Sequence, residues 1–241
     1  MADPGREYPS PAGNFRLACY PPRTDDTLQA WSAADNLLIE ELCRLQAPGA
    51  DTLVVNDEHG ALSVALSPRA LWTDSMLSVL ALRDNEGRNR RPATPVIWST
   101  AAPGTVPRYT ALRIPRQLAY LEYQLGHLAA RMTPGSLLLA AGMDKHLSPH
   151  TAAMLERHIG PTRRHRGQHK ARLFTATRDE RDAVCNATPA PYHCEQAGGA
   201  LQALANVFSR DRLDQGARAL LGELHRLEPG RRLLDLACGN G

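Results

Sequence analysis

RRLLDLACGNG, residues Arg231–Gly241, joins a short apolar run to an acidic residue and then to a glycine-rich turn. In a doubly wound α/β domain, the first strand passes to the first helix through such a turn, and a nucleotide lies across it. Glycine is needed there because the backbone approaches the ligand at angles that a side chain would forbid. The stretch therefore predicts a nucleotide-binding strand–turn–helix unit, with a tight turn that binds nothing as the alternative.

Apolar runs alternate with helical patterns along the preceding chain. The expected strands are 52–55, 70–72, 96–98, 109–114, 136–141 and 173–177, the last of which closes the sheet. The expected helices are 27–45, one that begins at residue 61, 75–85, 116–132 and 149–158. Asp25, Asp26 or Thr27 is the expected cap of the first helix. Strands that alternate with helices predict an α/β fold with a parallel, doubly wound (Rossmann-like) sheet.

Composition shifts divide the chain into four parts. Residues 1–24 are rich in Pro, Gly and Arg and are expected to form an irregular arm. Residues 25–181 form the first domain. Residues 182–200 lose periodicity and are expected to be a linker, and residues 201–241 begin a second domain.

The first domain carries a copy of the terminal pattern. Leu53–Gly60 has the same order of strand, turn and helix as Leu233–Asn240. Its turn, however, has a single glycine and places Asp57, Glu58 and His59 where a ligand would press on the backbone. We interpret this as a duplicated architecture whose first copy is degenerate. The alternative is that any α/β domain offers such a parallel by chance.

A basic band runs from Arg157 to Arg178, and no acidic residue interrupts it. Subtracting its seven positive charges from the net charge of +3 leaves −4 for the rest of the chain. Arginine pairs with two phosphate oxygens at once and stacks on unpaired bases, both of which folded RNA offers. The candidate RNA-binding residues are Arg163, Arg164, Arg166, Lys170 and Arg172. The alternative is a solvated loop in an arginine-rich protein.

Several classes of protein are disfavoured by the sequence. The 241 residues contain no apolar run of about 18 residues, and the N-terminus lacks the apolar stretch of a signal peptide. The five cysteines share no C-x-x-C spacing, so reduced thiols in a cytoplasmic protein are expected. Cys185, His193 and Cys194 lack a paired knuckle and a clear fourth ligand, so no metal site is expected. A hydrolase is disfavoured because no serine stands in a nucleophile-elbow context.

A second stretch narrows the function. ANVFSRDRLDQGAR, residues Ala205–Arg218, lies a short helix upstream of the terminal turn. Together the two resemble the pre-motif and motif I of the small-domain S-adenosylmethionine-dependent methyltransferases, and within that group the ribosomal RNA large-subunit methyltransferase G family. Segments 28–35, 53–57, 60–63 and 170–173 also fit, so the resemblance covers nearly the whole chain. One departure is Ala237, where the family usually has glycine; we expect weakened cofactor binding from it.

The resemblance implies a cofactor, a substrate and a set of cofactor contacts. Members of the family methylate the exocyclic amine of a guanine in large-subunit rRNA with S-adenosylmethionine. The implied cofactor-binding residues are Asp235, Gly239, Asn240 and Gly241 of motif I, with Phe208, Asp214 and Gly216 of the pre-motif segment. From the residues alone, Asp235 could equally be a helix N-cap and Phe208 an ordinary core aromatic. A nicotinamide-type dehydrogenase is disfavoured because the acid precedes the glycines.

No catalytic residue is assigned within the chain. The family's Asn-Pro-Pro-Phe turn, which holds the guanine, would lie beyond Gly241, and the first copy has Arg113-Ile114-Pro115-Arg116 in its place. We therefore expect the chain to supply the RNA-recognition half and motif I, and to neither methylate RNA nor bind S-adenosylmethionine tightly by itself. The alternative is a non-catalytic RNA-binding module with a degenerate methyltransferase fold.

Overall fold

The computed structural model describes residues 5–22, 28–183 and 190–226, together with positions 230, 232 and 234. The chain divides into two compact units, Met1–Cys185 and Asn186–Gly241. The division falls within 182–200, the stretch expected to be a linker. Within the described ranges, no helix is both long enough and apolar enough to cross a membrane.

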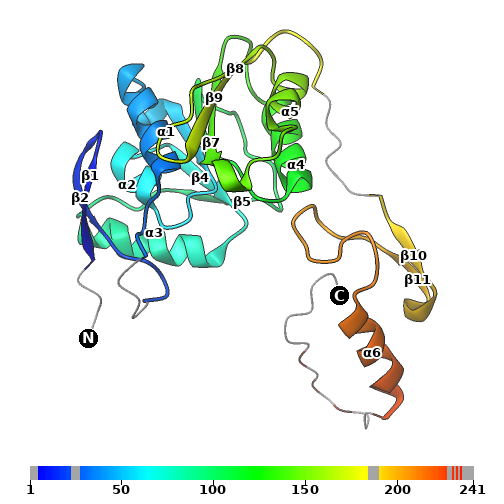
Figure 1. Ribbon diagram of the computed structural model, residues 1–241. Coiled ribbons are helices and arrows are strands. Elements are labelled where there is room, and N and C mark those ends of the chain that lie inside the picture. The colour runs from blue at the N-terminus through cyan, green and yellow to red at the C-terminus, as the bar shows by residue number, and fades with distance from the viewer. Residues whose placement is uncertain are drawn as a thin grey trace. The chain divides into compact units, whose positions relative to one another are not determined.

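A seven-stranded sheet forms the centre of the first unit (Figure 1), with the strand order β5-β4-β3-β6-β7-β9-β8. The first five strands in this order are parallel. In chain order the strands are β3 (Thr52–Val55), β4 (Ala70–Thr73), β5 (Val96–Trp98), β6 (Tyr109–Arg113), β7 (Leu137–Met143), β8 (Thr162–Arg164) and β9 (Ala171–Thr177). The predicted Rossmann-like α/β fold is confirmed.

Two details of the predicted sheet are wrong. Strand β9 runs antiparallel to β7, and β8, which the sequence did not suggest, pairs antiparallel with β9 and forms the edge. The connection between β8 and β9 is too short for the crossover that parallel strands need, so the two form a hairpin. The basic band therefore lies largely on an edge hairpin.

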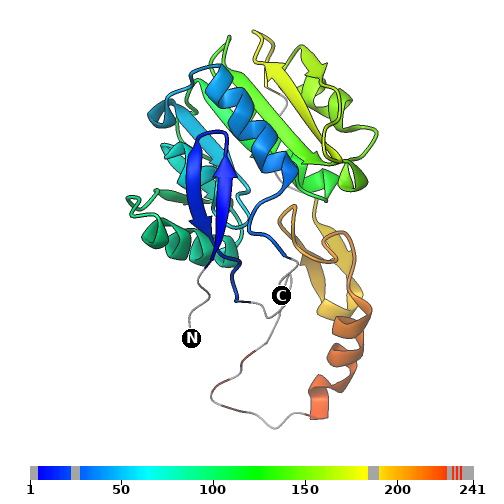
Figure 2. The ribbon, with the colours of Figure 1, turned by 60° about the vertical axis from the view of Figure 1, so that its left-hand side comes forward.

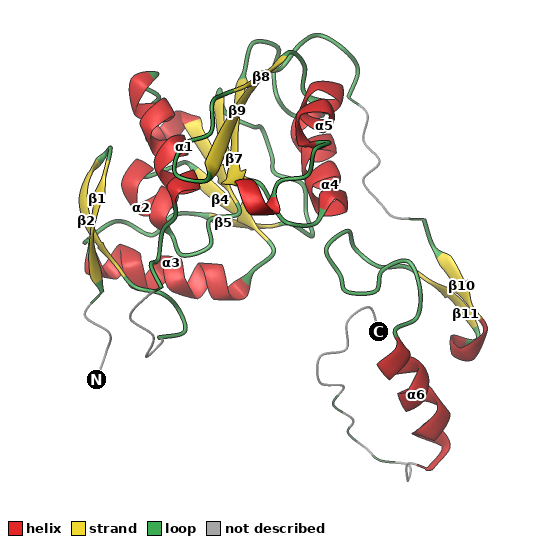
Figure 3. Cartoon of the chain, viewed as in Figure 1, coloured by secondary structure: helices red, strands yellow, loops and turns green. Residues whose placement is uncertain are grey.

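Helices cover both faces of the sheet (Figures 1 and 3). Helices α1, α2 and α3 lie on one side, where α1 packs on β7 and β9, and α4 and α5 lie on the other. Because both faces are covered, β3 and β4 are buried along their whole length. The helices are α1 (Ala33–Arg44), α2 (Ala61–Leu66), α3 (Met76–Arg88), α4 (Leu118–Ala129) and α5 (Thr151–His158), with short 3₁₀ turns η1 (Gly49–Asp51) and η2 (Asp144–His146).

Helix α1 begins later than the sequence predicted, at Ala33 instead of Thr27. Its cap is Ser32, whose backbone N–H donates to the Asp35 carboxylate at 2.7 Å. The N-cap of α1 is therefore Ser32 and not the expected Asp25, Asp26 or Thr27, which lie outside the described residues.

The expectation of an irregular arm over residues 1–24 is wrong for residues 6–17, while residues 1–4, 23 and 24 lie outside the described residues. Strands β1 (Arg6–Ser10) and β2 (Gly13–Leu17) form an antiparallel hairpin beside α2 and α3 (Figure 2). Tyr8 is buried and stacks on Trp31 at 4.7 Å between ring centroids. The buried amide of Asn85 on α3 accepts a hydrogen bond from the backbone N–H of Ala18 and donates one to its carbonyl, both at 2.9 Å. This pairing holds the segment after β2 much as a neighbouring strand would.

The described residues of the second unit contain two short strands and one α-helix. Strands β10 (Tyr192–Cys194) and β11 (Gly199–Leu201) pair antiparallel around the 3₁₀ turn η3 (Glu195–Ala197). Residues 192–201 are therefore structured, which corrects the expectation of a plain linker. Helix α6 (Gln215–Glu223) follows and continues into the 3₁₀ turn η4 (Leu224–Arg226).

Candidate nucleic-acid interface and degenerate nucleotide site

The basic edge hairpin, which we define as β8, β9 and their connection, presents four exposed cations. Arg163 and Arg164 lie on β8, and Arg166 and Lys170 lie in the connection. His169 and Lys170 both have positive φ, at 48° and 60°, and form the two-residue tip of the hairpin. Among the residues that the structure describes, none of the four cations takes part in an ion pair, so their guanidinium and ammonium groups face solvent.

Other cations of the band are held by neighbouring groups. Arg172 is half-buried, and its Nε lies 3.1 Å from the Asp144 carboxylate. Arg178 is only 7% exposed and donates to the backbone carbonyl of Ala129 at 3.1 Å. Arg157 lies 3.7 Å from a carboxylate oxygen of Glu122. The structure thus distinguishes the four solvent-facing cations from the three that pair with the protein's own groups. Contact of any of these cations with RNA stays a prediction.

At the carboxyl end of β3, in the first copy of the strand–turn–helix pattern, polar side chains pair with one another. Asn56 has a φ of 62° and directs its amide to Gln124 on α4. The two amides exchange hydrogen bonds of 2.9 and 2.8 Å, and Asn56 also donates to the carbonyl of Arg113 at 3.0 Å. Gln124 is fully buried. These hydrogen bonds direct the two amides to the protein's own groups.

The buried side chain of Asp57 stabilises the same turn. Its carboxylate is 1% exposed and accepts a hydrogen bond from the backbone N–H of Ser63 at 2.8 Å. Burial, together with the nearby carboxylate of Asp35, raises the pKa of Asp57 to about 6. Gly60, the one glycine of the turn, has a φ of 83°, and a Cβ there would lie 2.9 Å from the Cα of Leu82. This glycine therefore allows α2 and α3 to pack closely.

Arg113, which the resemblance sets in place of the family's guanine-holding turn, is also paired with the protein's own groups. Arg113 at the end of β6 directs its guanidinium to α1, where Nε lies 3.1 Å from the Asp35 carboxylate and Nη1 donates to the Ser32 hydroxyl at 3.0 Å. Both members of the ion pair are largely buried. With the Asn56–Gln124 pair, this supports the interpretation that the first copy is degenerate.

The pre-motif residues lie in the second unit. Phe208 is 72% exposed, so the alternative of a core aromatic was wrong. Asp214 is the N-cap of α6, and its carboxylate accepts from the backbone N–H of Gly216 at 2.8 Å. The motif I candidates Asp235, Gly239, Asn240 and Gly241 lie outside the described residues, so the cofactor-binding set stays a prediction.

Solved structures define the class of fold. A 16S rRNA methyltransferase of T. thermophilus (RsmC), solved in complex with AdoMet and guanosine, aligns with a TM-score of 0.65 at 15% identity, over 92% of this chain and 58% of that one. A putative SAM-dependent methyltransferase from Streptococcus mutans aligns with a TM-score of 0.55 at 11% identity, over 73% of this chain and 56% of that one. The fold is therefore that of the Rossmann-like methyltransferases.

Sequence comparison identifies the family. Residues 6–180 match the RLMG N-terminal domain, and residues 198–241 match the methyltransferase small domain. The chain belongs to the RLMG N-terminal domain family. Proteins named "Ribosomal RNA large subunit methyltransferase G" from Pseudomonas fluorescens and Pseudomonas paraeruginosa are each 38% identical to it, over 96% and 97% of this chain respectively. The chain spans about 64% of the length of these relatives.

Proposed function

We propose that the protein is an S-adenosylmethionine-dependent methyltransferase that modifies the exocyclic amine of a guanine in large-subunit ribosomal RNA. The observation that carries the proposal is the 38% identity, over 96% of the chain, to a protein named "Ribosomal RNA large subunit methyltransferase G". The order of the two family matches, an RLMG N-terminal domain followed by a methyltransferase small domain, supports it. A ribosomal RNA substrate implies a cytoplasmic location.

In this proposal the two units divide the work. The basic edge hairpin of the first unit contacts RNA through Arg163, Arg164, Arg166 and Lys170, with Arg172 positioned by Asp144 behind them. The second unit contributes part of the S-adenosylmethionine site, through Asp235 and the motif I glycines and through the segment of Phe208, Asp214 and Gly216. The cofactor supplies a methyl group on an activated sulfonium, so the protein's task is to bring a guanine out of its stack and position the amine.

A second function is favoured by one specific observation. The Asn56–Gln124 and Arg113–Asp35 pairs fill the strand ends of the first unit with the protein's own polar groups. A domain of this kind that kept only its basic hairpin would be a non-catalytic RNA-binding module. This module binds RNA with salt-sensitive affinity but transfers no methyl group.

Methyl transfer separates the two functions. The full-length gene product and the 241-residue chain are each incubated with methyl-labelled S-adenosylmethionine and protein-free large-subunit rRNA. We expect label on a guanine amine with the full-length protein, and RNA binding without transfer for the 241-residue chain. Asp235→Asn in the full-length protein is expected to lower transfer and leave RNA affinity as it is. RNA binding without transfer by the full-length protein would establish the module instead, and the absence of both would refute the two functions together.

A further inference from the structure

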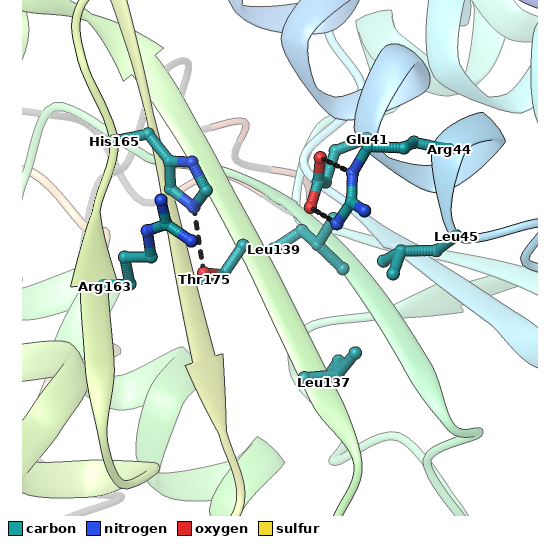
Figure 4. A pocket seen from close by; sticks show the side chains of 8 residues that line it. All are labelled: Glu41, Arg44, Leu45, Leu137, Leu139, Arg163, His165 and Thr175. Carbon is teal, nitrogen blue, oxygen red and sulfur yellow. Dashed lines mark hydrogen bonds and ion pairs between the residues drawn. The ribbon is translucent and has the colours of Figure 1, made fainter.

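A pocket of about 390 Å³ opens beside the basic edge hairpin, between the C-terminal end of α1 and strands β7, β8 and β9 (Figure 4). Its floor follows from the register of the sheet, in which Leu139 pairs with Thr175 and Thr175 pairs with Arg163. These three side chains form one row on the face that α1 covers. Because α1 ends at Arg44, this row is left open beyond the last turn of the helix.

The lining combines an apolar wall with a polar rim. Leu45 from the cap of α1 and Leu137 and Leu139 from β7 supply the apolar surface. Opposite them, a ring nitrogen of His165 lies 3.0 Å from the Thr175 hydroxyl. Burial lowers the pKa of His165, and the positive charge of Arg163 lowers it further. His165 is therefore neutral near pH 7, and because Nε2 is bonded to Thr175, its Nδ1 is the ring nitrogen that can donate or accept, according to the tautomer.

The third side of the pocket carries an ion pair. Nε and Nη2 of Arg44 donate to the two carboxylate oxygens of Glu41 at 2.8 and 2.6 Å. The hydrogen bond from Arg44 lowers the pKa of Glu41, so the carboxylate is charged at neutral pH. Arg44 itself is 66% exposed, and Arg163 lies across the pocket from it, beside His165 (Figure 4). The pocket thus has an arginine on each of two sides, with leucines and hydrogen-bonding groups between them.

We propose that this pocket holds one unpaired base of the bound RNA, with Arg163 and Arg44 contacting the phosphates on either side of it. The inference rests on the proposed RNA-binding function and assigns it a site. The volume suits a ligand of nucleotide size, since small-molecule pockets begin at about 300 Å³. Leucine side chains cover the apolar face of a base, and Glu41, His165 and Thr175 offer acceptors and donors to its edge. A bare phosphate or an acidic peptide fits less well, because the Glu41 carboxylate would repel it.

The choice of an unpaired base also follows from how proteins read RNA. The groove that displays base edges in A-form RNA is shallow, so sequence is mostly read on bases that are splayed out of a loop or bulge. A pocket beside exposed arginines can bind both the backbone and the base of such a ligand. In this arrangement the exposed cations contact the RNA backbone, and the unpaired base inserts into the pocket.

The test uses the full chain with two RNAs of equal length, a hairpin with an unpaired loop and a blunt duplex. Leu45→Trp fills the pocket without a change of charge, and Thr175→Val keeps its shape but removes the hydroxyl. Leu80→Trp on the exposed surface of α3 is the matched control. Because the larger side chain leaves no room for a base, we expect Leu45→Trp to weaken hairpin binding about tenfold, which corresponds to about 1.4 kcal/mol, and duplex binding hardly at all. Thr175→Val is expected to weaken hairpin binding about threefold, the effect of one lost hydrogen bond.

The outcomes separate the inference from the function on which it rests. Equal hairpin affinity for the wild type, Leu45→Trp and Thr175→Val would refute the proposal that the pocket binds a base. This would hold even if Arg164→Ala weakened binding to both RNAs. The absence of salt-sensitive RNA binding in the wild type would overturn the RNA-binding function and the pocket together. If Leu45→Trp lowers the melting temperature so far that the protein is unfolded, the hairpin affinity of Thr175→Val alone decides whether the pocket binds a base. Loss of hairpin affinity with Leu80→Trp would also count against the pocket.

Discussion

Replacing Asp57 by asparagine tests whether the turn after β3 is closed by a buried carboxyl, as the structure indicates. The Asp57 carboxylate is 1% exposed and is held by the backbone N–H of Ser63. Asparagine keeps the size of the side chain and an oxygen that accepts this hydrogen bond, but it cannot ionise. Any difference in the pH dependence of stability between the two proteins therefore comes from the ionisation of Asp57.

The magnitude follows from the pKa of this carboxyl. Burial raises it from 3.8 to about 6 in the folded protein. A folded-state pKa above the unfolded value means that the folded protein binds the proton more tightly, so the free energy of unfolding falls as the pH rises from about 4 to about 6. Each pKa unit corresponds to about 1.4 kcal/mol, so Asp57 lowers the stability of the wild type by about 3 kcal/mol over this window.

The assay is urea unfolding at a series of pH values, followed by the fluorescence of the buried Trp72. We expect the difference in unfolding free energy, Asp57→Asn minus wild type, to rise by about 3 kcal/mol between pH 4 and pH 7 and then to level off. Contributions of titrating groups that do not interact with the Asp57 carboxylate cancel in this difference. A difference in unfolding free energy that does not change with pH, or that falls as the pH rises, would show that the Asp57 carboxyl is not buried and that it does not close the turn after β3.

Three further substitutions test the fold and the interface. Asn85→Ala leaves the backbone N–H and carbonyl of Ala18 without their partner, which costs about 1–3 kcal/mol in urea unfolding; an unchanged midpoint would show that the N-terminal hairpin is not held there. Gln124→Ala breaks the buried amide pair and is expected to cost a similar amount, about 1–3 kcal/mol, by the same measurement. Arg164→Ala with Arg166→Ala removes two phosphate contacts and should reduce the slope of log K against log salt for single-stranded RNA by about 1.4; an unchanged slope would mean that RNA lies elsewhere.

The parts of the fold that the sequence predicted are those with buried apolar runs. Strands β3, β4 and β6 are enclosed by helices, so a run of Leu, Val and Ala was sufficient to locate them. Strand β8 has the sequence Thr162-Arg163-Arg164 and lies at the edge, where polar side chains face solvent, so no apolar signal marks it. The antiparallel direction of β9 depends on this missed partner and was missed with it.

Tertiary hydrogen bonds account for the other differences from prediction. The N-terminal hairpin contains Pro9 and Gly13, and its place in the structure depends on Asn85, which lies 67 residues from its partner Ala18. No local pattern reports such a contact. In the same way, seven cations in one band look alike in sequence, whereas Asp144 and buried carbonyls distinguish Arg172 and Arg178 from the exposed Arg164. The cofactor candidates of motif I depended on the resemblance to a family and remain predictions.

The central claim is that the first unit recognises ribosomal RNA and so supports methyl transfer. The kinetics of the full-length gene product test this claim most directly. In the variant Arg164→Glu with Arg166→Glu, the reversed charges lie on the basic edge hairpin, away from every residue assigned to the cofactor. We predict that kcat/KM for large-subunit rRNA falls at least tenfold, while the affinity for S-adenosylmethionine stays at the wild-type value. An unchanged kcat/KM for the RNA would contradict the assignment of RNA recognition to this hairpin.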